Sequence, residues 1–288
     1  MIEQLILGAI NGIVWGLIIA LIAIGFNLIF GLLNIKNLAH GEFFMLGAIT
    51  TTILIRPLGD LFFWPSLIIV PMIFFGLAYP IERFLFRPIS NSLNATLIVS
   101  IGLSYILQQV GLYIFGGIGT RIEFPIGGYI NIAGFSYPIY RLFVAFLSSI
   151  MLILLWLFLY RTGFGLLIRA SRRNKELAMS MGIPATTICA FTFCLGISFA
   201  ALSGILSMSI MPIHYLMGAD AFIPALIAVI VGGLGNLGGS LLAAIIVGEV
   251  EGIGAVFFSP TEARILSLLL LIGVLLFRPT GLFGGIRK

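Results

Sequence analysis

Charged residues are scarce in this sequence. They make up 9% of its 288 residues, whereas a soluble globular domain carries about 25%. This shortage excludes an ordinary soluble domain over most of the chain. The net charge of +5 does not indicate nucleic-acid binding, because the basic residues gather in short loops between apolar runs and not on one soluble face.

Groups that carry catalysis or bind metals are also few. Cysteine occurs only at Cys189 and Cys194, and their spacing in one predicted helix puts them on different faces, which argues against a disulfide or a metal site. The two histidines lie far apart, and no Ser/His/Asp set or Walker A motif is present. We therefore expect no enzyme activity, no metal and no cofactor in this chain.

Apolar residues dominate instead: 60% of the chain is hydrophobic, and its mean hydropathy is +1.21. The apolar runs approach the ~20 residues that a helix needs to cross the hydrocarbon core. This pattern predicts an all-α, polytopic membrane bundle with a single domain over residues 1–288. About eight or nine membrane segments are expected, at 5–32, 39–55, 63–81, 93–115, 140–160, 185–211, 221–231, 240–258 and 261–277.

Two of these segments, 39–55 and 221–231, are short, and each could either cross or re-enter the membrane. The second contains Pro224 and leads into the glycine-rich run 232–239. Glycine at this density predicts a broken helix or a tight re-entrant turn, which is tolerated where it is buried in protein or lines a cavity. In the loop 116–138, two short alternating stretches could pair as a β-hairpin.

Small residues recur at every fourth position in two segments. They are Gly8, Gly12 and Gly16 in the first segment, and Gly196, Ala200 and Gly204 in the sixth. Such ridges let helices approach closely in lipid. We expect both ridges to pack helices together, with contact to another subunit as the alternative for the first.

One charged run stands out, at 161–184. It holds five basic residues against a single acid, Glu176. Lysine and arginine in short loops stay on the cytoplasmic side of a membrane, so this run predicts the orientation, with the amino terminus outside and the carboxyl terminus cytoplasmic. In that orientation eleven of the 15 lysines and arginines are cytoplasmic.

Part of this run predicts a surface helix. Residues 166–181 contain no proline or glycine, and Gly182 and Pro184 then end the helix. The apolar positions that fall near one face are Leu166, Ala170, Leu177 and Met181. The helix would either lie on membrane lipid headgroups or dock a cytoplasmic partner.

A second polar group stands at the start of segment 39–55, where His40 and Glu42 enter the membrane. Ionisable side chains are costly there, so they indicate a functional site by default. The alternative is that the two residues cap the start of a helix, where an acid is favoured near the positive end of the helix dipole. Two such residues do not make a metal site.

Several motifs resemble one family. Residues 176–182 resemble the Glu-Ala-Ala…Gly coupling motif of ABC importer permeases: Ala178 and Gly182 match it, whereas Leu177 departs from it. The segments GFNLIFGLLN, NIKNLAHGEFFMLGA, GGLGNLGGSLLAA and FRPTGLFG are similar, in this order, to the branched-chain amino acid permease family of the LivH/LivM type. The resemblance covers nearly the whole chain and suits the LivH-like half better.

The resemblance implies an importer in a bacterial or archaeal inner membrane. Its other parts would be a second, LivM-like permease subunit, two cytoplasmic ATP-binding subunits and an external substrate-binding protein, which would hold most of the selectivity. The residues implied in ATPase coupling are Arg169, Arg172, Arg173, Glu176, Ala178 and Gly182. The candidates for the translocation pathway are Asn37, His40, Glu42, Asn236, Glu249 and Glu251.

Two other classes of protein compete with this interpretation. An ion-coupled secondary transporter or channel for a small polar solute could use Glu42, Glu249 and Glu251 as proton or cation sites. An intramembrane enzyme would need a nucleophile paired with a base, and the sequence offers none.

Overall fold

The computed structural model describes residues 1–33, 35–117, 119–120, 122, 126–132, 135–173 and 175–284, with the backbone alone at 32, 132, 135, 172–173 and 175–176. The α-helices are α1 (Ile2–Leu33), α2 (His40–Leu58), α3 (Phe63–Pro80), α4 (Leu93–Phe115), α5 (Ile139–Arg161), α6 (Gly163–Arg173), α7 (Lys175–Ser180), α8 (Ala185–Ser207), α9 (Met217–Gly232), α10 (Leu237–Phe257) and α11 (Pro260–Phe277). Short 3-10 and π turns at 60–62 and 81–89 flank α3.

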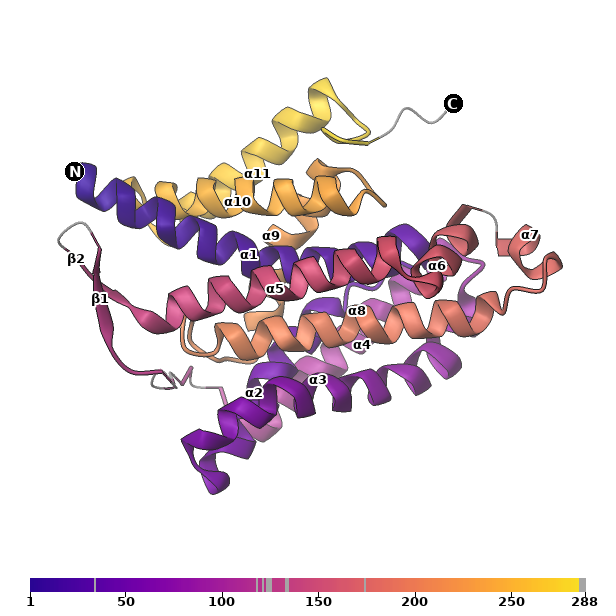
Figure 1. The fold of residues 1–288 in the computed structure, drawn as a ribbon, viewed down its shortest axis with the longest axis horizontal. Coiled ribbons are helices and arrows are strands. Elements are labelled where there is room, and N and C mark those ends of the chain that lie inside the picture. The colour runs from indigo at the N-terminus through magenta and orange to yellow at the C-terminus, as the bar shows by residue number, and fades with distance from the viewer. Residues whose placement is uncertain are drawn as a thin grey trace.

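Within the described residues, eight helical stretches are long and apolar enough to cross a membrane, and α9 is a shorter apolar helix. The prediction of an all-α, multi-pass membrane bundle is therefore confirmed. The amino terminus lies at one end of the bundle beside the hairpin of β1 (Tyr129–Ile132) and β2 (Phe135–Pro138), whereas α6 and α7 lie at the other end (Figure 1). The hairpin is antiparallel, as the alternating pattern predicts.

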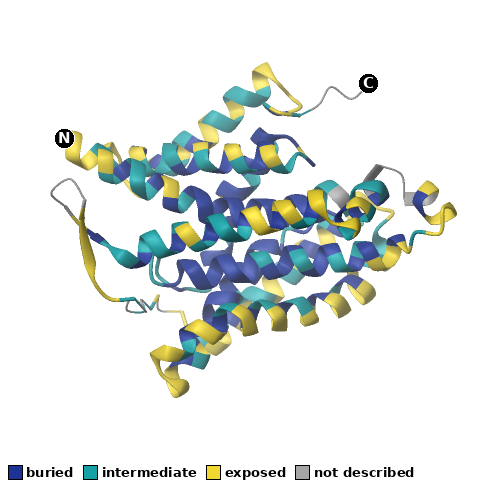
Figure 2. Ribbon diagram, viewed as in Figure 1, coloured by how far each residue is buried: buried dark blue, intermediate teal, exposed yellow. Residues whose placement is uncertain are grey.

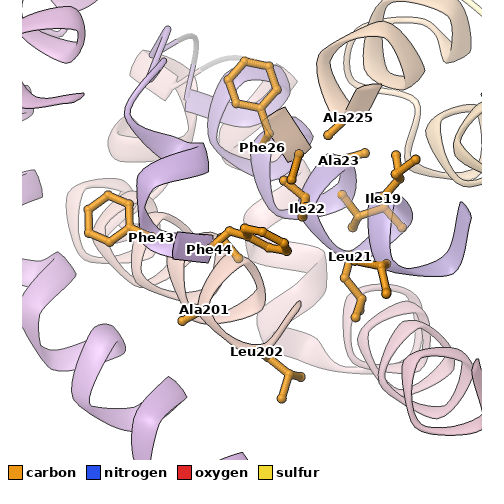
Figure 3. Close-up of a cluster of buried hydrophobic side chains, with 14 of the residues drawn as sticks. Ile19, Leu21, Ile22, Ala23, Phe26, Phe43, Phe44, Ala201, Leu202 and Ala225 are labelled. Atoms are coloured by element: carbon orange, nitrogen blue, oxygen red, sulfur yellow. The ribbon is translucent and has the colours of Figure 1, made fainter. Parts of the chain in front are cut away.

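The core is centred on α1 and α8. Residues 18–23 of α1 have no exposed surface, and α1 packs against α8, α9 and α10. Helix α8 packs in turn against α2 and α3. Apolar side chains from α1, α2, α8 and α9 meet in this core (Figure 3). Burial is deepest in the middle of the bundle, and exposed residues gather on the outer helices and at the ends (Figure 2).

Glycines allow the closest helix contacts. A Cβ atom on Gly12 would lie 2.9 Å from Glu249 Cα of α10, and Gly8 and Gly16 face the same helix. A Cβ atom on Gly196 would lie 2.6 Å from the carbonyl oxygen of Gly25. One on Gly204 would overlap the carbonyl oxygen of Phe44, and Ala200 is fully buried on the same helix. Both small-residue ridges thus lie against neighbouring helices of this chain.

Helix α2 begins inside the bundle. His40 contacts Ile22 of α1, which lies eleven residues before Leu33, or about 16 Å along the helix axis. Helix α9 begins at the same place, because a Cβ atom on Gly41 would lie 2.5 Å from the carbonyl oxygen of Gly218. The two short segments therefore meet near their first turns in the interior of the protein.

Two details refine the expected boundaries. Residues 166–181 lie in α6 and α7, which are described on either side of residue 174; α6 packs on α5 and α8, whereas α7 buries only Ala178 among its described side chains. Helix α9 starts at Met217, four residues earlier than predicted. Glu42 lies in the first turn of α2, where the helix dipole favours an acid, but the N-cap residue is Ala39 and there is no side-chain cap hydrogen bond.

Candidate functional site

Glu42 joins three helices in the interior. Its side chain leaves α2, and its Oε1 accepts hydrogen bonds from Ser104 Oγ and Gln108 Nε2 of α4, each at 2.8 Å. Its Oε2 has no hydrogen-bond partner among the described residues and lies against Gly218 of α9. The carboxylate is therefore half satisfied, with one oxygen still able to accept a proton or a donor.

His40 fixes the start of α2 against α1. Its Nε2 lies 3.2 Å from the carbonyl oxygen of Ile22. A carbonyl oxygen can only accept, so Nε2 carries the proton and Nδ1 is bare. The ring lies between Phe26 and Phe222, with centroids 5.8 and 6.3 Å away, and Nδ1 has no partner among the described residues.

Asn37 is fully buried just before α2. Neither its Oδ1 nor its Nδ2 has a hydrogen-bond partner among the described side chains and backbone groups. Buried polar atoms are nearly always paired in stable proteins. Asn37, His40 and Glu42 thus place unpaired polar atoms in one short segment.

The glycine-rich turn after α9 is held by an asparagine of α1. Asn27 Oδ1 accepts from the amide of Gly235 at 2.7 Å, and Asn27 Nδ2 donates to Ser240 Oγ at 2.8 Å. Gly233 and Gly235 have φ values of 95° and 81°, a region that side-chain-bearing residues rarely adopt. The turn between α9 and α10 is therefore a joint that side-chain hydrogen bonds from α1 hold in place.

Asn236, predicted in the pathway, belongs to this joint. Its Oδ1 accepts from the amide of Gly239 at 3.0 Å and so caps α10, and its Nδ2 donates to the carbonyl oxygen of Phe283 at 2.8 Å. The amide of Leu282 also bonds to the carbonyl oxygen of Val231. Two motifs that are distant in sequence, 232–239 and 277–284, are thus packed on each other.

The two acids of α10 lie elsewhere. Glu251 accepts from Trp15 Nε1 of α1 at 2.9 Å and from Ser267 Oγ of α11 at 3.0 Å. Glu249 is half-buried beside Gly12 of α1. No hydrogen bond in the described part of the chain joins either acid, or Asn236, to the group at 37–42. Among the described residues, no three His, Cys, Asp or Glu side chains come together as metal ligands.

At the α6–α7 end, the predicted coupling residues are only partly described. Arg169 places its guanidinium over the ring of Tyr160, 5.0 Å from the centroid. The side chains of Arg172, Arg173 and Glu176 lie outside the described residues. Ala178 is buried, and Gly182 has φ of 80° and ends the segment.

Three of the four apolar positions predicted to share one face of this segment are exposed. Leu166, Leu177 and Met181 are exposed, Met181 by 73%, whereas Ile168 and Ala178 are buried. The periodicity alone could not decide this, because the underlying face is selected by α5 and α8. The exposed apolar side chains leave this end of the protein with a surface that a partner could cover.

The opposite end is tied by polar contacts. Tyr137 Oη donates to Asn11 Oδ1 at 2.9 Å, and Arg141 donates to the same oxygen. Burial raises the pKa of Tyr137 above its ordinary value, and nearby Arg141 only partly offsets this, so the phenol remains a donor. Arg264 Nη1 donates to Asp220 Oδ1 at 2.8 Å and joins α11 to α9.

The sequence did not single out the partners of these groups. Ser104 and Gln108 are four residues apart on α4, a spacing that puts both on one helix face and could have predicted an acceptor opposite them. Trp15 and Asn27 gave no such signal, because their partners are more than 200 residues away in the chain.

A helical bundle with two helices that begin in its interior, and with unpaired polar atoms where they meet, has the architecture of a membrane transport protein. The family model described as "Branched-chain amino acid transport system / permease component" matches residues 8–275. The chain therefore belongs to this family.

Comparison with individual proteins points to the same family. The chain is 31% identical to the high-affinity branched-chain amino acid transport system permease protein BraD of Pseudomonas aeruginosa, over 96% of this chain and 94% of the relative. It is 28% identical to the corresponding LivH of Salmonella typhimurium, over 95% and 94%. It is 27% identical to the probable LivH of Methanocaldococcus jannaschii, over 95% and 91%. No solved structure matches the chain.

Proposed function

We propose that this chain is a permease subunit of an ATP-driven importer of branched-chain or related amino acids, in the cytoplasmic membrane of a bacterium or archaeon. The observation that carries the proposal is the match to permease components along residues 8–275, which includes Asn37, His40, Glu42 and the α6–α7 segment. The substrate class is taken from the names of the relatives.

In this proposal the chain works with a second permease subunit, two cytoplasmic ATPases and an external binding protein. It contains no nucleotide-binding motif of its own, so ATP would be hydrolysed on the partner chains. The binding protein would deliver the solute to the hairpin end of the bundle, and the ATPases would bind at the α6–α7 end.

The α6–α7 segment is the proposed coupling element. Met181 and Leu177 expose apolar surface there, and the basic residues of 169–175 precede them in the sequence. Closure of the ATPase pair would push this segment and favour one of two conformations of the bundle. Because Gly182 adopts a positive φ, a side chain at that position would also distort the end of the segment.

The pathway candidates follow from the interior group. Asn37, His40 and Glu42 hold unpaired polar atoms where α2 and α9 meet. They are proposed to meet the solute or its water as the bundle opens. Asn236, Glu249 and Glu251 are weaker candidates, because hydrogen bonds already occupy Asn236 and Glu251 and because Glu249 lies against α1.

Reconstitution tests the proposal. The tagged chain is purified from its host in mild detergent, its partners are identified by mass spectrometry, and the complex is placed in liposomes with the external binding protein. We expect leucine, isoleucine or valine uptake that needs ATP, and loss of uptake when the ATPases are omitted. A chain that purifies alone and moves solute under an ion gradient would instead establish the secondary transporter.

A coupling variant makes the test sharper. Gly182→Arg, or charge reversal at Arg172 and Arg173, is expected to leave the chain inserted while ATP hydrolysis continues without uptake. Thr186→Ala, at an exposed position just beyond the segment, serves as the matched control and keeps both activities. Uptake equal to that of the unchanged protein in the Gly182→Arg variant would contradict the assignment of the coupling segment.

A further inference from the structure

Helix α4 is held loosely on the outside of the bundle. It buries only Thr96, Ser100 and Gly111. Its firmest polar attachment is the pair of hydrogen bonds from Ser104 and Gln108 to Glu42. The opposite face of the helix contacts no other part of the described chain closely and is exposed along its whole length.

That exposed face carries polar groups in the middle of a membrane span. Tyr105, the thirteenth of the 23 residues of α4, is 64% exposed. Gln109 is exposed one turn further on, and Gly102 lies one turn before Tyr105 on the same face. At 1.5 Å per residue, Gln109 lies about 8 Å from the centre of the helix, well inside the hydrocarbon layer.

The outward faces of the other spanning helices are less polar than this face of α4. Among the residues that the structure describes, Gln109 is the only exposed amide or charged side chain more than one turn inside an α-helix of a spanning stretch. Arg83 is exposed too, but it lies in the π turn 81–86 that follows α3 and donates to the hydroxyl of Tyr79. Most exposed positions of α3, α5 and α11 within the span are apolar, as in Ile68, Phe146 and Leu269, and the exposed hydroxyl of Tyr79 already accepts a hydrogen bond from Arg83. Those faces suit lipid, whereas a carboxamide against lipid tails leaves two donors and an acceptor unpaired.

We propose that the Gly102–Tyr105–Gln109 face of α4 is the surface on which the second permease subunit packs. The carboxamide of Gln109 and the hydroxyl of Tyr105 then bond to polar side chains of a helix of that subunit, and Gly102 lets its backbone approach. Lipid tails cannot supply such partners. This inference rests on the proposed function, because only a permease pair supplies that second subunit.

The position of this face has a consequence for the interior group. Gln108 and Ser104 reach Glu42 from the other side of α4, so one helix separates the subunit contact from the carboxylate. A shift of α4 against the second subunit would move both donors away from Glu42. The contact between subunits is thereby connected to the group where α2 and α9 meet.

Photocrosslinking tests the inference in native membranes that contain the whole transporter. The photoreactive residue benzoylphenylalanine replaces Tyr105 or Gln109, and, as matched controls, Phe146 or Leu269. After irradiation the adducts are identified by mass spectrometry. We expect Tyr105 and Gln109 to yield an adduct with a permease-family chain, and the control positions to yield lipid adducts.

Adducts with lipid alone at Tyr105 and Gln109, or no more permease adduct there than at Leu269, would overturn the inference. A fifth position, Met181, separates this result from failure of the proposed function. An adduct between Met181 and an ATPase shows that the transporter is assembled. Lipid adducts at Tyr105 alongside that product therefore refute the α4 contact alone.

A second variant tests the chemistry of the contact. Gln109→Leu keeps the size of the side chain and removes its hydrogen bonds, and Ile106→Leu on the same face is its control. We expect Gln109→Leu to lower the Tyr105 adduct by about threefold, as for the loss of one interhelical hydrogen bond in a membrane. An unchanged yield in Gln109→Leu would exclude the hydrogen-bonded contact.

Discussion

At the scale of single residues, the notable feature is a set of buried polar atoms that are only half paired. Glu42 illustrates it: Oε1 accepts two hydrogen bonds, and Oε2 accepts none from the described residues. Polar groups inside a membrane protein are costly, and unpaired ones are more so. This cost is tolerable where a second conformation or a passing solute supplies the missing partner.

Two substitutions at Glu42 distinguish its contribution to stability from its contribution to transport. Glu42→Ala leaves the donors of Ser104 and Gln108 unpaired and should lower the free energy of unfolding by about 1–3 kcal/mol. Glu42→Gln keeps an oxygen at Oε1 but removes the charge, so it should melt near the unchanged protein and yet transport several-fold more slowly. Thermal melting in detergent and uptake in liposomes measure the two effects. Full uptake by Glu42→Gln would remove Glu42 from the pathway.

At the scale of elements, helix packing depends on glycine at particular contacts. Gly204 of α8 touches the backbone of α2, and a methyl group there would overlap the carbonyl oxygen of Phe44. Gly76 of α3 has nothing within 4 Å of the same position. Both glycines lie inside an α-helix, and only Gly204 is in contact with a neighbouring helix.

We predict that Gly204→Ala lowers the free energy of unfolding by about 1–3 kcal/mol, because overpacking forces α2 and α8 apart. Gly76→Ala should leave it unchanged or raise it slightly, since alanine favours a helix. Melting temperatures of the two purified variants make the comparison. Equal effects would mean that helix propensity, and not the contact with α2, governs Gly204.

The joint between α9 and α10 gives a second prediction at this scale. Asn27→Ala removes the acceptor of the Gly235 amide and the donor to Ser240. It should cost about 1–3 kcal/mol and expose the turn to proteolysis. Asn94→Ala, at an exposed asparagine of α4, is the control and should change neither property. If Asn27→Ala changed neither the free energy of unfolding nor the rate of proteolysis at the turn, backbone packing alone would hold the turn.

At the scale of the whole molecule, the two ends of the bundle carry different groups. The hairpin and the amino terminus share one end, and α6 and α7 lie at the other (Figure 1). The basic residues of 161–184 predict that the α6–α7 end is cytoplasmic.

Cysteine labelling checks this orientation. In a background where Cys189 and Cys194 are replaced by alanine, we expect Tyr129→Cys in the hairpin to react with an impermeant maleimide added outside intact cells. Met181→Cys should react only after the membrane is opened. The chain is expressed without its proposed ATPases, so that both side chains are exposed and access across the membrane decides the result. The reverse pattern would invert the topology.

The sequence alone determined the fold class, which is a membrane bundle, and the approximate positions of its spans and glycine ridges. Through four ordered motifs it also determined the family. These features follow from composition and local periodicity, which need no knowledge of distant contacts. The hairpin was also predicted, because its two strands are adjacent in the chain.

The tertiary structure alone decided which polar residues share a site. It separated Asn236, which caps α10 and holds the carboxyl-terminal segment, from Asn37, His40 and Glu42, which lie where α2 and α9 begin. It also decided which side of the α6–α7 segment is buried in this chain, because that side is selected by α5 and α8 beneath it. The physical reason is that hydrogen-bond partners such as Gln108 and Glu42 lie 66 residues apart and are brought together only by packing.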